Sequence, residues 1–369
     1  MRVGVLGLGA IGTIFFTRLG LLAANSKTKE ELSTLFVDAF IKPTQFDIWM
    51  ESKKPQFALQ GQNNDKNEML EFRVDSDEKV ATGINASNVR VRTIESAGAE
   101  PYNEKLDVLL VAVKAYDSAG VIRDLRARNR HLLNDDALCV LLQNGLGELP
   151  EDGEEGSLLD TGGQWKFANG VTFVGGRVLG FGKVLTSGLD AGMTYLAPFV
   201  GSDNDEGEQD AKMKAVAQVF LAAGINCEVL EASKMQAMLW RKLIVNAAIN
   251  PLASLLDAPN RSVVSSAGSR HCVNMVVQEA LAVAQREQIP LSCTQHELVE
   301  DILEVACNTG TNVCSMLADL RRGSRTEIDA ITGRIVAGGK RHGVPTPTNE
   351  LLLSLVKALE LEGTRRRSD

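Results

Sequence analysis

Residues 1–12 read MRVGVLGLGAIG, a short apolar strand that runs directly into a glycine-rich turn. Gly7, Gly9 and Gly12 give this turn the spacing G-x-G-x-x-G, and apolar residues then continue at roughly helical spacing. A strand, turn and helix in this order bind a dinucleotide pyrophosphate, because the helix N-terminus offers unpaired N–H groups and a positive dipole end. The alternative is a glycine-rich turn in another kind of α/β protein. The expected cofactor contacts are Gly7, Leu8, Gly9, Ala10, Ile11 and Gly12.

The N-terminal part of the chain alternates between strand and helix patterns. Two predicted strands, 107–113 and 137–142, are apolar almost throughout, which is typical of strands buried on both faces of a parallel sheet. The other strands are expected at 2–6, 46–50, 89–94, 169–176, 182–187 and 193–196.

From about residue 208 the apolar residues recur at three- and four-residue spacing, which predicts helices. We therefore expect an α/β, Rossmann-like NAD(P)-binding domain over residues 1–230 and an all-α substrate and catalytic domain over residues 231–369. The helices are expected at 208–223, 233–256, 264–287, 295–306, 324–341 and 348–361.

Two stretches fit this domain poorly. The second strand of a dinucleotide fold usually ends about twenty residues after the glycine turn. The expected second strand, FDIWM at 46–50, ends more than forty residues after Gly7. Residues 22–44 are therefore interpreted as an inserted helical segment. Residues 60–88 are polar and lack strong periodicity, so they are interpreted as a long loop.

Composition excludes several classes of protein. The net charge of −8 argues against a nucleic-acid partner. No apolar run approaches the roughly eighteen residues of a membrane span, and the first strand leaves no room for a targeting peptide. The six cysteines lack C-x-x-C spacing, which indicates reduced thiols in a cytoplasmic protein, with no metal site.

Residues 240–252, WRKLIVNAAINPL, combine an apolar helix with a polar stripe. Lys242, Asn246 and Asn250 lie at i, i+4 and i+8, so they share one helix face. Such groups are costly to bury without partners, and they suit a site for a polar anionic ligand. The alternative is a solvent-exposed stripe on an amphipathic helix.

A second polar group of residues lies at 312–329, NVCSMLADLRRGSRTEID. Asn312 and Ser315 are close in sequence, and Glu327 stands where an amphipathic helix begins. Taken alone, Glu327 is a helix-start carboxylate favoured by the helix dipole.

Taken together, these blocks resemble the ketopantoate reductase (2-dehydropantoate 2-reductase) family. The resemblance covers most of the chain outside the two poorly fitting stretches. Its most specific parts are KLIVNAAINPL at 242–252 and SMLADLRRGSRTEID at 315–329. The other matching blocks are GLGAIG at 7–12, VAVKAYD at 111–117, LLQNGLG at 141–147, NGVTFVGGRV at 169–178 and PN at 259–260.

The resemblance implies NADPH-dependent reduction of 2-dehydropantoate to pantoate, on the route to pantothenate and coenzyme A. Lys242 matches the catalytic lysine, which protonates the ketone oxygen, and Glu327 matches the glutamate that positions substrate and lysine. The residues that match substrate contacts are Asn246, Asn250, Asn260, Asn312 and Ser315. A paralogue acting on another bulky 2-oxo acid, and a non-catalytic NAD(P)-binding sensor, are the alternatives.

Lys114 and Asn144 match positions on the nicotinamide side of the cofactor, although Asn144-Gly145 is also a common turn pair. The family usually places an arginine after the second strand to hold the 2′-phosphate of NADP. Here Ser52 and Lys53, with Lys54, stand after FDIWM and are expected to replace it, whereas Glu51 there would favour NAD. Asp117 stands where an amide is more usual. The expected cofactor is NADP, with NAD the less favoured alternative. A homodimer through the helical domain is also compatible with the sequence.

Overall fold

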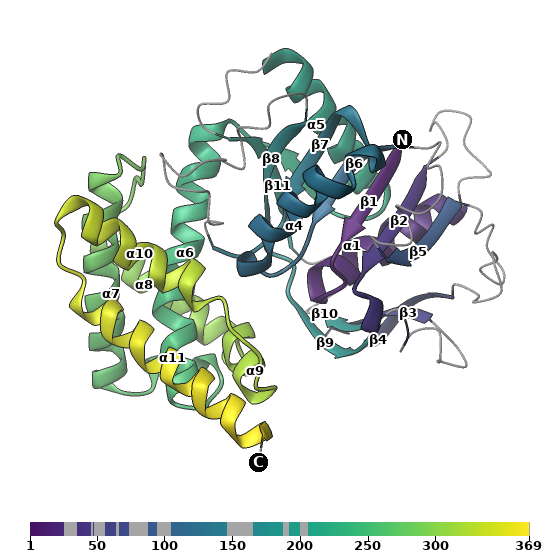
Figure 1. Cartoon of the computed structure of the whole chain (residues 1–369). Helices are drawn as coiled ribbons and strands as arrows, with labels where there is room; N and C mark the ends of the chain where they lie inside the picture. The colour runs from purple at the N-terminus through teal and green to yellow at the C-terminus, as the bar shows by residue number, and fades with distance from the viewer. Residues whose placement is uncertain are drawn as a thin grey trace. The chain divides into compact units, whose positions relative to one another are not determined.

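The computed structural model describes residues 1–25, 35–45, 47, 56–63, 66–73, 88–93, 105–145, 165–186, 192–199 and 206–368. The chain divides into two units, which are described separately (Figure 1). The first is Met1–Gln143 with Leu149–Met235, and the second is Asn144–Glu148 with Gln236–Asp369. Among the helices of the described ranges, none is long and apolar enough to cross a membrane.

The first unit is built on an eight-stranded sheet of order β12-β11-β8-β7-β6-β1-β2-β5. The strands from β5 to β8 run parallel, and β11 is antiparallel to β8. The strand order therefore reverses between β1 and β6, the position where doubly wound sheets bind nucleotides. The strands are β1 (Arg2–Leu6), β2 (Phe36–Ile41), β5 (Val89–Thr93), β6 (Leu106–Val111), β7 (Leu133–Leu141), β8 (Lys166–Thr172), β11 (Thr194–Pro198) and β12 (Cys227–Val229).

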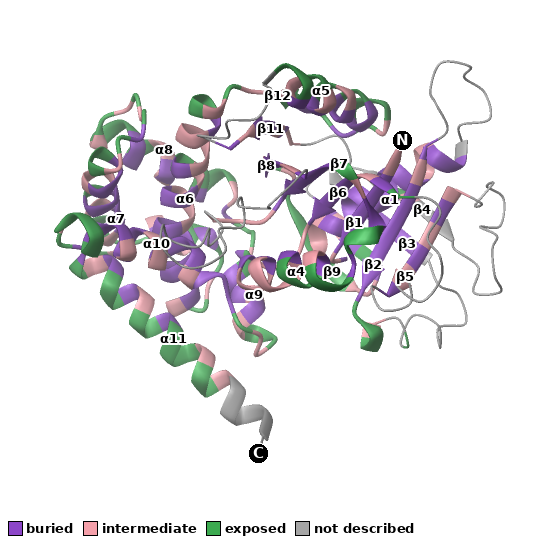
Figure 2. Ribbon diagram, turned by 45° about the horizontal axis from the view of Figure 1, so that its top comes forward, coloured by how far each residue is buried: buried purple, intermediate pink, exposed green. Residues whose placement is uncertain are grey.

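Helices cover both faces of this sheet (Figure 1). Helices α1 (Ala10–Asn25) and α5 (Glu206–Ala222) share one apolar core, in which the rings of Phe15 and Phe220 meet edge to face at 5.1 Å. Helix α4 (Ala115–Arg128) packs Ile122 and Leu125 into a second core on the other side of β6 and β7. The strands between are buried, as Figure 2 shows in purple, because both faces are covered.

The second strand is not where the sequence pattern placed it. Strand β2, Phe36–Ile41, pairs in parallel with β1, so the expectation of a second strand at 46–50 is wrong; of those residues only Asp47 is described, and it is helical. The inserted helical segment at 22–44 is wrong as well, because α1 continues through Asn25 and β2 occupies the segment's end. Residues 26–34 lie outside the described ranges. The apolar pattern of β2 is interrupted by Asp38, a buried carboxylate that accepts a hydrogen bond of 2.8 Å from Arg90 on β5.

A second, four-stranded sheet has the order β4-β3-β10-β9. It consists of β3 (Gln56–Asn63), β4 (Lys66–Arg73), β9 (Gly176–Gly180) and β10 (Lys183–Thr186). The expectation of a loop over 60–88 is therefore wrong from 60 to 63 and from 66 to 73, while 64–65 and 74–87 lie outside the described residues. In β3, Phe57, Ala58 and Leu59 are all buried, and the ring centroids of Phe57 and of Phe16 in α1 lie 4.9 Å apart. Residues 60–63 and 66–73 of these strands are mostly polar, which is why the sequence pattern predicted a loop there.

The second unit is all helical, so the structure has the expected fold class. Trp240, Ile244 and Ala248 of the first helix lie at its centre. Helix α9 was not expected as a separate helix. The helices are α6 (Ala232–Leu255), α7 (Ala267–Arg286), α8 (Gln295–Asn308), α9 (Ser315–Arg321), α10 (Ile328–His342) and α11 (Pro347–Ser368), with a short 3₁₀ turn at Asn260–Val264.

Candidate active site

The three glycines of the first turn meet different requirements. Gly7 has φ +91°, and a Cβ there would lie 2.8 Å from Cγ1 of Val113. A Cβ on Gly12 would collide with the carbonyl oxygen of Gly7, so only glycine lets α1 approach the strand. A Cβ on Gly9 would meet no described atom within 4 Å, and Gly9 is exposed. This opening beside the start of α1 fits a pyrophosphate that approaches the backbone at Gly9.

The other expected contacts of this turn lie at the start of α1. Ala10 and Ile11 are its first two residues, where N–H groups have no partner within the helix. Leu8 is buried, and its carbonyl oxygen accepts from the hydroxyl of Thr13 at 3.2 Å. Lys114 follows β6, the strand beside β1. It occupies the N-cap position of α4, where its backbone is extended.

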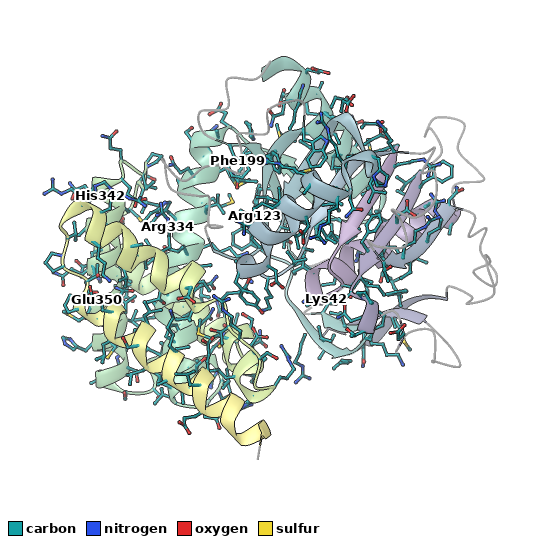
Figure 3. The ribbon with its side chains drawn as sticks, in the orientation of Figure 1. Lys42, Arg123, Phe199, Arg334, His342 and Glu350 are labelled. Carbon is teal, nitrogen blue, oxygen red and sulfur yellow. The ribbon has the colours of Figure 1, made fainter. Side chains whose placement is uncertain are left out.

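The residue that follows β2 is Lys42, labelled in Figure 3. Its Nζ lies 3.7 Å from Oδ2 of Asp117 in the first turn of α4, and 74% of its side chain is exposed. Lys42 is not among the residues predicted from the sequence, because the second strand was expected at 46–50. The apolar run of residues 36–41 is the signal that could have found it. Ser52 and Lys53, expected at this position, lie outside the described residues.

On α6, Lys242, Asn246 and Asn250 follow one another at one-turn intervals. Burial lowers the pKa of Lys242 from its ordinary value to about 8, and the negative charge of Glu327 opposes that fall. Asn250 is buried, and its carbonyl oxygen accepts from the thiol of Cys314 at 3.7 Å. Lys242 and Asn246 are half-buried.

Glu327 is the residue directly before α10, and its side chain makes no capping bond to that helix. Instead its Oε2 accepts a hydrogen bond of 3.4 Å from Nδ2 of Asn144. Glu327 is buried, with 6% of its surface exposed. Asn144, Lys242 and Glu327 therefore form one interacting group within the second unit, and a lysine with a pKa near 8 beside a carboxylate can donate a proton near neutral pH.

The remaining expected contacts lie around the loop that follows α8. The N–H of Asn260 donates to the carbonyl oxygen of Asn312 at 3.0 Å, and Nδ2 of Asn260 donates to Thr309 at 2.9 Å. Oδ1 of Asn260 is buried and has no hydrogen-bond partner among the described residues. Asn312 is exposed, as is Ser315, the first residue of α9. Across the parts of the chain that the structure covers, no cluster of three metal-ligating side chains occurs.

Family profiles match both units. The profile described as ketopantoate reductase PanE/ApbA matches residues 64–201, and the one described as ketopantoate reductase PanE/ApbA C terminal matches residues 234–360. The 2-dehydropantoate 2-reductase of Archaeoglobus fulgidus is 31% identical over 276 residues, which cover 74% of this chain and 84% of that protein. The chain belongs to the ketopantoate reductase family. The family's 2-dehydropantoate 2-reductase from Pyrococcus abyssi is 28% identical over 366 residues, 99% of this chain and 100% of that protein.

Solved structures show the same fold. A PanE/ApbA family ketopantoate reductase from Ralstonia eutropha JMP134 aligns with a TM-score of 0.72 at 23% identity, covering 99% of this chain and 100% of that one. A D-mandelate dehydrogenase in a ternary structure with NADH and anilino(oxo)acetate also reaches 0.72, at 22% identity and 99% coverage of both chains. A ketopantoate reductase from Staphylococcus aureus, described as dimeric, reaches 0.67 at 19% identity, covering 98% of this chain and 100% of that one. This family member is an oxidoreductase whose family binds a nicotinamide dinucleotide.

Proposed function

We propose that this chain reduces 2-dehydropantoate to pantoate with NADPH, on the route to pantothenate and coenzyme A. The observation that carries the proposal is the group formed by Asn144, Lys242 and Glu327, in which the charge of a buried carboxylate acts on a lysine with a pKa of about 8. A ketone reductase needs a proton donor, and this lysine can serve as one, because a proton must reach the ketone oxygen as negative charge develops there.

When bound, NADPH supplies the hydride for the ketone carbon. Lys242 donates a proton from Nζ to the ketone oxygen, and Glu327 keeps that ammonium charged by opposing the effect of burial. A pKa of about 8 suits this role, because the group is mostly protonated at neutral pH and yet gives up its proton readily. Asn144 donates to the same carboxylate and so fixes its orientation.

The rest of the substrate is assigned to the polar residues that the sequence predicted as substrate contacts. Asn246, Asn250, Asn312 and Ser315 are proposed to bind the carboxylate and hydroxyl groups. Among these residues, Asn260 has the most specific proposed contact, because its buried Oδ1 receives no hydrogen bond from the described residues. Unpaired buried oxygens are unfavourable, so a substrate hydroxyl that donates to this atom would be bound preferentially.

The preference for NADPH is assigned to Lys42. In dinucleotide folds, recognition of the ribose 2′ position occurs just beyond the second strand, and Lys42 follows β2 directly. A lysine ammonium binds phosphate as a point charge. The glycine turn and Lys114 are proposed to hold the remainder of the cofactor. Ser52 and Lys53 remain secondary candidates for the contact with the 2′-phosphate.

A second candidate is reduction of another bulky 2-oxo acid with NADH. It is favoured by the structural similarity to D-mandelate dehydrogenase with NADH, which is as high as that to the ketopantoate reductase from Ralstonia eutropha. A sensor that binds the cofactor without turnover is disfavoured, because cofactor binding alone gives no reason to keep Lys242 beside Glu327.

One assay separates these functions. Oxidation of NADPH and of NADH is followed at fixed enzyme with 2-dehydropantoate, with oxophenylacetate, with other 2-oxo acids and without substrate. The proposal expects the highest kcat/KM with NADPH and 2-dehydropantoate. Higher kcat/KM with NADH and oxophenylacetate supports the second candidate, and cofactor binding without turnover on any 2-oxo acid supports a sensor.

We also propose a cytoplasmic homodimer. The six cysteines are free, as expected in a reducing compartment. Leu351, Leu355 and Leu359 of α11 are exposed at four-residue intervals, so they form one apolar stripe. The structurally similar Staphylococcus aureus enzyme is described as dimeric. Sedimentation of the native chain and of Leu355→Glu tests this: a dimer that the substitution dissociates is expected, and a native monomer would contradict it.

A further inference from the structure

The C-terminal helix α11 contacts the segment that carries Glu327 at two points. The carboxylate of Glu360 accepts a hydrogen bond of 2.6 Å from the backbone N–H of Thr326. The Nζ of Lys357 lies 2.6 Å from Oδ1 of Asp329. Lys357 and Glu360 are three residues apart on a helix and therefore share a face. They hold the chain immediately before Glu327 and two residues after it.

The contact at Thr326 is the more constraining of the two. Thr326 is almost fully buried, with 1% of its surface exposed, and its hydroxyl oxygen accepts from the N–H of Ile328 at 3.2 Å. A bond from an N–H to a carboxylate is stronger than one between neutral groups, and losing it would leave a buried donor unpaired. In contrast, Lys357 and Asp329 are more exposed, and Arg325 also pairs with Asp329 at 3.3 Å.

Glu327 depends on this support because its own side chain does not anchor it to α10. Its backbone occupies the N-cap position with φ −93° and ψ 24°, and no side-chain capping bond fixes the start of the helix. Its carboxylate instead accepts a hydrogen bond from Asn144, and its negative charge acts on Lys242. The backbone that carries this carboxylate is held on one side by the N–H of Ile331, which donates to the carbonyl oxygen of Glu327 at 3.1 Å, and on the other side by the contact of Thr326 with α11.

We propose that Glu360 is a positioning residue, which holds the backbone at Thr326 so that Glu327 stays beside Lys242. The inference rests on the proposed function, since it gives Glu327 and Lys242 their roles in the reaction. Glu360 acts through the main chain of Thr326 and takes no part in proton transfer. Its side chain lies 34 residues further along the chain, so no local motif around Glu327 indicates this role.

The test compares four variants of the full-length enzyme, assayed with NADPH and 2-dehydropantoate between pH 6 and pH 10. Glu360→Ala removes the acceptor, Glu360→Gln keeps an acceptor without the charge, and Glu327→Gln removes the charge beside Lys242. Glu362→Ala is the matched control, since it makes the same charge change at an exposed position on the same helix.

Glu360→Ala is expected to lower kcat by roughly tenfold to a hundredfold, the scale of a misplaced catalytic group. Because Glu327 opposes the lowering of the Lys242 pKa, its displacement should move the alkaline limb of the kcat profile to lower pH. Glu360→Gln should restore most of both properties, Glu362→Ala should match the wild type, and the KM for NADPH should not change. A purely structural contact would alter Tm without moving the pH profile.

The outcomes distinguish a failure of the positioning role of Glu360 from a failure of the proposed function. If Glu327→Gln is impaired while Glu360→Ala has the wild-type kcat and pH profile, the positioning role is wrong and the proposed function stands. If Glu327→Gln itself behaves as wild type, the proposed function fails and the positioning role fails with it. Should Glu360→Ala not fold, Glu360→Asp retains the charge but shortens the reach; a shifted alkaline limb is expected, and an unshifted one overturns the proposal.

Discussion

The amide of Asn144 donates to the carboxylate of Glu327 over 3.4 Å, although 183 residues separate the two in the chain. Each has a simpler local explanation, Asn144 as part of a turn and Glu327 as a helix-start carboxylate. The turn is real, since Gly145 has φ +79° and a Cβ there would collide with the carbonyl oxygen of Ala330. The side chains nevertheless serve a different purpose, because Glu327 makes no side-chain capping bond and its charge acts on Lys242.

The first prediction concerns Lys242. Replacing it by alanine should lower kcat by roughly 10²–10⁴, the range typical of a lost general acid. Wild-type kcat should stay level below pH 8 and fall above it, because the lysine must be protonated to act and its pKa is about 8. Steady-state kinetics across pH measure both effects. A Lys242→Ala enzyme within a few-fold of wild-type kcat would exclude the assigned role.

The second prediction concerns Glu327. Glu327→Ala should raise KM for the 2-oxo acid and lower kcat together, because positioning and chemistry are coupled. Its alkaline limb should also lie at lower pH than in the wild type, since Glu327 opposes the lowering of the Lys242 pKa. Kinetics and thermal unfolding of the same variant provide the check. Normal kinetics with a lower Tm would support a structural role at the start of α10 instead.

The glycine turn and the Lys242 helix could be predicted from sequence because each depends on local spacing. Three glycines between an apolar strand and a helix, and polar residues at positions 242, 246 and 250 of α6, remain recognisable without knowing the rest of the fold. The fold class and the helical half were predictable for the same reason, since their periodic patterns are long.

The second strand was not predictable in the same way, because its pattern depends on a partner distant in sequence. Asp38 interrupts the apolar run of β2, and its burial is stabilised by Arg90 on β5, which pairs with it. The later FDIWM run at 46–50 also holds one aspartate among apolar residues, so composition does not separate the two runs, and the strand was misplaced onto the later one. That error moved the expected 2′-phosphate position from Lys42 to Ser52 and Lys53. The contact between Glu360 and Thr326 was likewise beyond reach, since it joins α11 to the segment that precedes α10, far away in the sequence.

A third prediction separates two glycines of the first turn. Gly9→Ala should leave Tm nearly unchanged, because a Cβ there meets no described atom within 4 Å, but it should weaken NADPH binding by closing the approach to the backbone. Gly12→Ala should lower Tm, because its Cβ would collide with the carbonyl oxygen of Gly7. Thermal unfolding and NADPH titration measure the pair. Unchanged NADPH affinity in folded Gly9→Ala would contradict a pyrophosphate site at this turn.

The fourth prediction concerns Lys42 and Asp117. Lys42→Ala should cost roughly 1–3 kcal/mol in kcat/KM with NADPH, the scale of one or two charge-assisted hydrogen bonds, and leave NADH kinetics unchanged. The preference for NADPH should weaken with added salt, because an exposed pair is screened. Asp117→Asn should improve KM for NADPH only a few-fold, since it releases Lys42 from an exposed ion pair of 3.7 Å.

Lys53→Ala combined with Lys54→Ala serves as the comparison for this assignment. A loss confined to NADPH in the double variant, with Lys42→Ala unaffected, would return the 2′-phosphate site to the residues first expected from the sequence. Equal losses with NADPH and NADH in Lys42→Ala would mean that this lysine does not recognise the phosphate.

The fifth prediction concerns which substrate the enzyme distinguishes. 2-Dehydropantoate carries a terminal hydroxyl that 3-methyl-2-oxobutanoate lacks, and Oδ1 of Asn260 is a buried acceptor with no donor among the described residues. Asn260→Ala should therefore lower kcat/KM for 2-dehydropantoate roughly tenfold, the scale of one buried hydrogen bond, while the value for 3-methyl-2-oxobutanoate changes little. Thr309→Val is the control, since it removes the partner of Nδ2 and leaves Oδ1 in place. It should reduce Tm and preserve the discrimination between the two acids. Equal losses for both acids in Asn260→Ala would assign Asn260 to the structure of the loop after α8, and the hydroxyl would then have to be recognised elsewhere.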